Sequence, residues 1–312
     1  MLLAASGAAG LCGLTAHPSL ATLTNGGLYR PLLERGLDLF AEAGIELQDL
    51  PLEQSLRSRD ATRGKGAKAT PVRLRTLAFS TATLRQVRAV SIDAGPQLQV
   101  LNFCLFPDLR YGLPTFSADC VTLPGGHLIA IDCQPNGHPS PPALAAAGAL
   151  GAAFARHRPS LPDGGAIPVE ARRFFSPQFL WSRMPLSVGD EALIAKVLPA
   201  FEEYLAIYLA EAGRAQPHDE AAALEATRTA QLDYANYRIR KDPARPMLTS
   251  LFGPEYAERL IRELLFDLPF QLGLGGGEAE RRGCSATTDA ATRPHAQARN
   301  GKAVIPLSAN EI

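Results

Sequence analysis

The hydrophobic and polar positions between residues 72 and 133 follow the pattern of a β-sheet. Short apolar runs rich in Val, Leu, Ile and Phe are separated by turn signals such as Pro124-Gly125-Gly126. Apolar runs with Gly and Pro between them are typical of antiparallel strands. The pattern therefore predicts strands over residues 72–79, 86–93, 98–106, 115–123 and 127–133.

Elsewhere the apolar residues recur at the spacing of a helix. We expect helices over residues 29–43, 143–156, 219–240 and 254–266, and a longer one that begins after Gly189. Asp190 is a candidate N-cap of that longer helix, and Pro199 inside it predicts a kink. Because the strands come first and most helices follow, the expected fold class is α+β, one antiparallel sheet with helices packed on its faces.

The ends of the chain and one internal segment do not fit either pattern. Residues 1–25 are expected to be disordered or transit-like, since the first 33 residues contain no Asp or Glu, although the absence of an early Arg argues against a transit peptide. A main domain is expected over residues 26–270, and a Gly-rich disordered tail over residues 271–312. Residues 55–70 are interpreted as a charged linker, and residues 137–142 as a break after the sheet.

The composition of the chain argues against several classes of protein. The 312 residues carry a formal net charge of zero, which argues against a nucleic-acid binder, and no apolar run approaches the roughly 20 residues of a membrane span. The 5 cysteines are widely spaced and form no C-x-x-C pair, so the sequence predicts neither a disulfide framework nor a zinc or iron–sulfur site. We expect a protein from a reducing compartment with no bound metal.

Three polar residues stand inside the predicted strands, namely Asn102, Asp119 and Asp132. A carboxylate among apolar strand residues is hydrogen-bonded, exposed on one face of the sheet, or kept at a raised pKa for proton chemistry. Asp132 is interpreted as structural. For Asp119, a structural role and a role in proton chemistry both remain open. The chain contains no G-x-G-x-x-G after a strand, no Walker loop and no H-E-x-x-H motif. If the protein does redox chemistry, we expect the electrons to come from a partner.

Several ordered motifs give the chain a family resemblance. LQVLN at 98–102 is followed by Phe106-Pro107, Tyr111-x-x-Pro114 and Ala118-Asp119. FFSPQFLWSR at 174–183, YRIRKDPAR at 237–245, LFGPEY and RELLFDL come later. In this order, from about residue 73 to residue 268, the motifs resemble those of the ferredoxin-dependent bilin reductases. The resemblance implies an α/β/α sandwich, a biliverdin IXα substrate between the sheet and the C-terminal helices, and reduced ferredoxin as the external electron donor.

The resemblance also implies catalytic residues. Asp119 matches the family's central acid, and Asp242 matches the acid of its C-terminal Asp-Pro motif; both are expected to deliver protons to the tetrapyrrole. At the position of Asn102, the phycocyanobilin-forming branch of the family has a histidine. Asp93 is a second candidate because it matches an acid of the dihydrobiliverdin-forming branch, although a residue before Ala-Gly-Pro also suits a turn.

Basic residues are expected to bind the substrate and the partner. Bilin propionates favour arginine, which binds carboxylates with two hydrogen bonds, and the candidates are Arg183, Arg238 and Arg240. Complementary charge would suit the docking of an acidic ferredoxin. The residues expected to form this docking face are Lys241, Arg245, Arg259 and Arg262.

The motifs favour phytochromobilin as the product. The alternative products are 15,16-dihydrobiliverdin and phycoerythrobilin. Asn102 argues against the phycocyanobilin-forming branch. Asp119 complicates the choice, because plant phytochromobilin synthases commonly carry Asn at that place. A non-enzymatic bilin carrier is the rival from another class. The resemblance favours a soluble plastid protein, and we expect a monomer.

Overall fold

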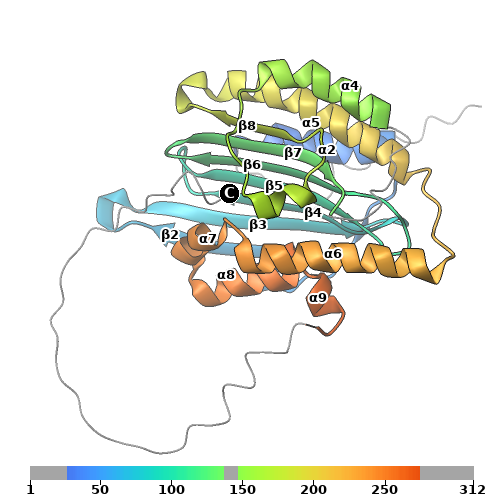
Figure 1. Ribbon diagram of the computed structural model, residues 1–312. Helices are drawn as coiled ribbons and strands as arrows, with labels where there is room; N and C mark the ends of the chain where they lie inside the picture. Colours follow the sequence, from blue (N-terminus) through green and yellow to red (C-terminus); the bar gives the residue numbers. More distant parts are fainter. Residues whose placement is uncertain (1–26, 137–146, 275–312) are drawn as a thin grey trace, which may run out of the picture. The chain divides into compact units, whose positions relative to one another are not determined.

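The computed structural model describes residues 27–136 and 147–274 (Figure 1). The chain divides into two compact units between Tyr234 and Ala235. The predicted disordered start, the predicted break at 137–142 and nearly all of the predicted tail lie outside the described residues.

An antiparallel sheet dominates the first unit. Over the described residues it has eight strands in the order β1-β3-β4-β5-β6-β7-β8, and β2 pairs with the same side of β3 as β1 does. The strands are β1 (Gln48–Asp49), β2 (Ser58–Arg63), β3 (Thr70–Ser80), β4 (Leu84–Asp93), β5 (Gln99–Pro107), β6 (Thr115–Leu123), β7 (Gly126–Gln134) and β8 (Leu180–Met184). All strands predicted from the sequence are present, and the α+β prediction is confirmed.

The interpretation of residues 55–70 as a linker was wrong. A short helix α3 (Gln54–Arg57) leads into β2, and a 3₁₀ turn η1 (Gly66–Lys68) joins β2 to β3. The six residues of β2 pair with β3, and Asp60 binds the Arg75 guanidinium at 2.5 Å. Because no residue of β2 is buried, its sequence lacks the apolar alternation that marks a strand with one face in a core.

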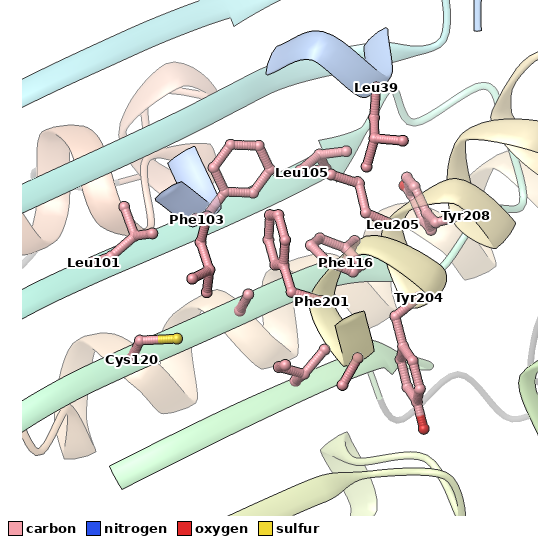
Figure 2. Close-up of a cluster of buried hydrophobic side chains, with 14 of the residues drawn as sticks. Leu39, Leu101, Phe103, Leu105, Phe116, Cys120, Phe201, Tyr204, Leu205 and Tyr208 are labelled. Carbon is pink, nitrogen blue, oxygen red and sulfur yellow. The ribbon is translucent and has the colours of Figure 1, made fainter. Parts of the chain in front are cut away.

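One face of the sheet packs against helices α2 (Arg30–Glu42) and α5 (Asp190–Ala212), and α4 (Ala147–His157) lies on α5 (Figure 1). Figure 2 shows the aromatic centre of this core. Phe201 of α5 meets Phe103 and Phe116 edge to face, with ring centroids 5.5 and 6.1 Å apart. Such aromatic pairs bury large apolar areas and fix the helix on the sheet.

Helix α5 begins differently from the prediction. Gly189, at φ 77°, is the N-cap, and Asp190 is the first helical residue without a side-chain capping bond. Asp190 still favours the helix, because a carboxylate in the first turn complements the helix dipole. The helix continues through Pro199 over 23 residues.

The remaining helices follow the sheet in the chain. Up to Tyr234, helix α6 (Ala221–Lys241) belongs to the first unit, where Gln231 donates to the Pro107 carbonyl at 3.1 Å and Tyr234 contacts Phe174 of η3 (Val169–Phe174). Two more 3₁₀ turns in this unit are η2 (Arg158–Ser160) and η4 (Leu186–Val188).

The second unit contains the end of α6 and then α7 (Arg245–Phe252), α8 (Pro254–Leu260), the π-helix η5 (Ile261–Leu265) and α9 (Leu268–Gln271). The helix predicted over 254–266 is therefore present, although its second half is a π turn. In the part of the chain that the structure describes, no helix is long and apolar enough to cross a membrane.

Candidate functional site

The face of the sheet opposite the α5 core carries polar side chains on its central strands. Since successive residues of a strand point to opposite faces, this face is defined by the residues that alternate with the core positions. Its polar members on β4 to β7 are Gln86, Arg88, Asn102, Ser117, Asp119, Asp132 and Gln134. A polar patch in the middle of a sheet, where a plain core would be apolar, marks a candidate binding surface. We call it the polar sheet face.

Asn102 and Asp119 lie together at the centre of the polar sheet face. They are directly opposite each other on β5 and β6, and both are half-buried. Directly opposed residues have Cβ atoms about 4.5–5.5 Å apart, so both side chains can touch one ligand. Val90 and Ala130 flank the pair on the neighbouring strands and leave apolar surface on either side. The structure thus joins two of the predicted site residues.

Asn102 is held by its neighbours on the same face. Its side-chain oxygen accepts a hydrogen bond from Arg88 Nη2 at 2.8 Å, and the Cys104 thiol lies 3.6 Å from the same oxygen. Arg88 is only 1% exposed, and its guanidinium lies over the Phe106 ring at 5.3 Å. Arg88 was not among the predicted site residues. Only the register of the β4–β5 hairpin places it opposite Cys104, two residues from Asn102.

Asp93 lies on the other face of the sheet. It ends β4, and one carboxylate oxygen accepts hydrogen bonds from the Gly95 amide at 3.1 Å and from the Gln99 side chain at 2.6 Å. These contacts close the turn to β5, which is the turn role that a residue before Ala-Gly-Pro suggests. The geometry does not bring Asp93 together with Asn102 and Asp119.

Asp132 is a fully buried carboxyl at the end of β7. It accepts hydrogen bonds from the Ser176 amide at 2.9 Å and from the Ser176 hydroxyl. Burial raises the pKa of Asp132 to about 7, because the loss of water disfavours the charged form more than the Ser176 hydrogen bonds favour it. Tyr204 of α5 donates to the Gln178 carbonyl at 2.7 Å and holds the same segment from the core side. Asp132 thus anchors the segment that leads into β8.

We expect the buried Asp132 to make the protein less stable as the pH rises. Its pKa is raised on folding from 3.8, so the folded state binds the proton more tightly and unfolding becomes easier between about pH 4 and pH 7. The slope is at most about 1.4 kcal/mol per pH unit. Asp132→Asn should remove this contribution, which urea unfolding at pH 5, 6, 7 and 8 would measure.

Asp163→Asn removes an exposed carboxyl and is the matched control. If the Asp132→Asn protein loses stability with rising pH as steeply as the wild type, the buried carboxyl is not the source of the slope.

A cavity of about 430 Å³ opens beside β8. Its wall includes three aromatic residues with stacked rings. The ring centroids of Phe175 and Phe179 are 4.2 Å apart, and those of Phe179 and Trp181 are 6.2 Å apart. Arg158, Asp163 and Arg172 also line it, and Arg158 pairs with Asp163 at 2.9 Å. The cavity therefore suits a flat ligand, and Arg172 is the lining arginine best placed to meet a negative group on it.

The predicted substrate ligand Arg183 lies next to this cavity wall. Its side chain is on the polar sheet face, and its guanidinium lies 5.6 Å from the centre of the Trp181 ring. The Arg183 Nε atom is buried and has no hydrogen-bond partner. A buried donor without a partner is costly, so this group is well placed to bind an acceptor brought by a ligand.

Gly164 makes room for Trp181. The Gly164 amide donates to the Trp181 carbonyl at 3.1 Å, and a Cβ atom at Gly164 would overlap the indole ring. Gly164→Ala is expected to displace the indole and to cost about 1–3 kcal/mol of stability. Because Trp181 is the single tryptophan of the chain, its fluorescence reports the displacement directly.

Gly151 of α4 is the matched control, because a Cβ atom there would meet nothing within 4 Å. Gly151→Ala should leave the emission spectrum unchanged and raise helix stability slightly. An unchanged spectrum in Gly164→Ala as well would contradict the proposed contact.

The second unit holds Asp242 in a buried ion pair. Its carboxylate accepts from Arg238 Nη2 at 2.7 Å and from the Ala244 amide at 2.8 Å, and its side chain is 2% exposed. The Arg238 guanidinium lies 5.2 Å from the centre of the Phe266 ring. Arg238, which was predicted to bind a propionate, therefore orients Asp242. Arg240 is exposed.

The expected docking face in the second unit is largely neutralised. Arg245 and Arg262 both pair with Glu258, and Arg259 pairs with Glu263 at 2.9 Å. Paired charges attract an acidic partner less than free ones, so this face is electrostatically weaker than its basic residues alone indicate. Its role in ferredoxin docking stays a prediction.

Among the described residues no cluster of His, Cys, Asp and Glu could hold a metal ion. Cys104, Cys120 and Cys133 are buried free thiols, of which Cys120 and Cys133 lie in the core against α5.

Comparisons with known proteins agree with these features. A sequence profile of the family described as ferredoxin-dependent bilin reductase matches residues 39–267. A phycoerythrobilin:ferredoxin oxidoreductase of Parasynechococcus marenigrum is 43% identical over 220 residues, which cover 70% of this chain and 84% of the relative. The protein of the same name from Gloeobacter violaceus is 42% identical over 243 residues, which cover 77% of this chain and 96% of the relative.

A solved structure is similar as well. Phytochromobilin synthase from tomato in complex with biliverdin superimposes with a TM-score of 0.69. The match covers 78% of this chain and 85% of that one at 24% sequence identity, and it shows a shared fold.

Proposed function

Since the chain belongs to the ferredoxin-dependent bilin reductases, we propose that it forms phycoerythrobilin from a more oxidised linear tetrapyrrole. Membership makes it an oxidoreductase of linear tetrapyrroles that takes electrons from ferredoxin. The observation that carries the product is the identity of 42–43% to relatives named phycoerythrobilin:ferredoxin oxidoreductase. The motifs favoured phytochromobilin, but the phytochromobilin synthase compared above shares only 24% identity and supports the fold alone.

The polar sheet face supports a proton-delivery role for Asp119. Reduction of one carbon–carbon double bond requires two electrons and two protons. Ferredoxin supplies the electrons one at a time, and each added electron makes the tetrapyrrole more basic. A half-buried carboxyl in reach of the ligand is suited to give a proton to the reduced carbon skeleton. Asp119 then regains its proton from water before the next turnover.

The propionates are assigned to arginine on the cavity side of the sheet. Arg183 is the best candidate, because its buried Nε atom lacks a partner and its guanidinium lies beside the Trp181 ring. Arg238 is a weaker candidate because it already binds Asp242. A flat tetrapyrrole also matches the stacked rings of Phe175, Phe179 and Trp181.

One anaerobic experiment tests the proposal. The protein is mixed with reduced ferredoxin and either biliverdin IXα or 15,16-dihydrobiliverdin, and the products are separated by chromatography. Phycoerythrobilin from at least one substrate is the expected result. Phytochromobilin as the end product would overturn the assignment, and NADPH without ferredoxin should give no product because the chain has no dinucleotide-binding motif.

The same experiment tests the carrier alternative. A carrier would shift the absorption spectrum of the bilin without consuming electrons from ferredoxin. The relatives named above are cyanobacterial. The plastid location, which the family resemblance and the acid-free first 33 residues suggested, therefore stays a prediction. The monomeric state likewise stays a prediction.

A further inference from the structure

Arg88 is a deeply buried charged side chain beside the Asn102–Asp119 pair. It comes from β4, and the hairpin register places it on the polar sheet face, opposite Cys104 of β5. Its exposed fraction is 1%, and its Nη2 atom donates to the Asn102 side-chain oxygen at 2.8 Å. A hydrogen bond from a charged donor is stronger than one between neutral groups, so this contact restrains the Asn102 side chain.

The contact also determines which way the Asn102 amide points. A guanidinium has only donors, so the atom that faces Arg88 must be the amide oxygen. The Cys104 thiol lies 3.6 Å from the same oxygen, in a geometry that lets it donate as well. With the oxygen engaged on this side, the NH₂ group of Asn102 is directed away from Arg88. The two donors of the amide are then available to the central part of the polar sheet face.

We propose that Arg88 is a positioning residue, which fixes the Asn102 amide so that its NH₂ group donates to a carbonyl oxygen of the bound tetrapyrrole beside Asp119. This inference rests on the proposed function for the identity of the ligand. The bilin carries lactam carbonyls, and an NH₂ donor in fixed orientation both anchors such an oxygen and stabilises negative charge that develops on it during reduction. A freely rotating amide would present its oxygen part of the time and repel the same carbonyl.

Asn102→Asp is the sharpest test, because it keeps the oxygen that Arg88 binds and removes the NH₂ donors. Turnover with reduced ferredoxin should fall roughly tenfold or more, which is the effect of losing one hydrogen bond in the transition state. The absorption spectrum of bound biliverdin should change as well. Wild-type turnover and an unchanged spectrum in Asn102→Asp would overturn the proposal.

A double-mutant cycle tests whether Arg88 acts through Asn102. Arg88→Gln should lower turnover roughly tenfold in the wild type and have little further effect in an Asn102→Ala background. Arg88→Lys keeps the charge but not the planar fork, so its effect should resemble that of Arg88→Gln. Equal losses in both backgrounds would show that Arg88 acts independently of Asn102 and would overturn the proposal. Should the Arg88 variants fail to fold, Asn102→Asp still decides the matter.

Arg85→Gln is the matched control. The Arg85 guanidinium lies over the same Phe106 ring at 5.0 Å, but the variant leaves the bond from Arg88 to Asn102 in place. It should keep wild-type turnover and spectrum. Failure of the proposed function is distinguishable from failure of this inference: in the first case the wild-type protein forms no phycoerythrobilin, and in the second it does so equally well when Asn102→Asp is introduced.

Discussion

Replacement of Asp119 by asparagine is expected to leave bilin binding intact and to lower turnover at least about a hundredfold. The substitution keeps the shape of a side chain directly opposite Asn102 and removes the proton. Stopped-flow absorption under anaerobic conditions should show biliverdin taking up an electron and then persisting as a trapped radical. Titration of the bilin spectrum measures binding separately from turnover.

Asp93→Asn is the comparison on the same sheet, because Asp93 lies on the opposite face and closes the β4–β5 turn. It should lower stability more than turnover. Product formation by Asp119→Asn at the wild-type rate would transfer the proton-donor role to another acid, and Asp242 would be the first to examine.

Removal of the Asp242 carboxylate is expected to destabilise the protein by about 3–5 kcal/mol, because it breaks the buried ion pair between Asp242 and Arg238. Asp242→Ala also breaks the bond to the Ala244 amide, which precedes α7. Thermal unfolding should therefore shift markedly downward. Turnover should be lost as well if Asp242 donates a proton to the bilin.

The double variant Asp242→Ala/Arg238→Met separates these two effects. With both members of the ion pair removed, much of the stability should return, whereas turnover should not if the carboxyl takes part in the chemistry. Recovery of both stability and turnover would assign Asp242 a purely structural role. Asp242→Asn can still accept a hydrogen bond from the Ala244 amide, so its stability should lie between those of the wild type and Asp242→Ala.

The central strands could be predicted because their apolar residues repeat between Gly-Pro turns. This pattern also located Asn102 and Asp119, since a polar residue inside such a strand is conspicuous. Their direct opposition on β5 and β6 could not be predicted, because it depends on the register of two strands. The same dependence hid Arg88 and the position of Asp93 on the other face.

Other features depend on contacts between residues far apart in the sequence. Asp132 was expected to be structural, and no local pattern indicated that Ser176, 44 residues later, would bury and hold it. The basic residues near Asp242 suggested a docking face. The pairs Arg259–Glu263 and Arg262–Glu258 are four residues apart, so the predicted helix over residues 254–266 could have indicated them. The pair between Arg245 and Glu258 joins α7 to α8, and only the fold shows it.

The charged strand β2 has one further consequence, for the solubility of the protein. Within the described residues, no strand pairs with the outer side of β2, so its backbone donors and acceptors there could accept a strand from a second molecule. Arg59, Asp60 and Arg63 lie along this edge. Charged side chains on an exposed edge oppose strand addition, so the residues that resemble a linker in the sequence protect the sheet against edge-to-edge aggregation.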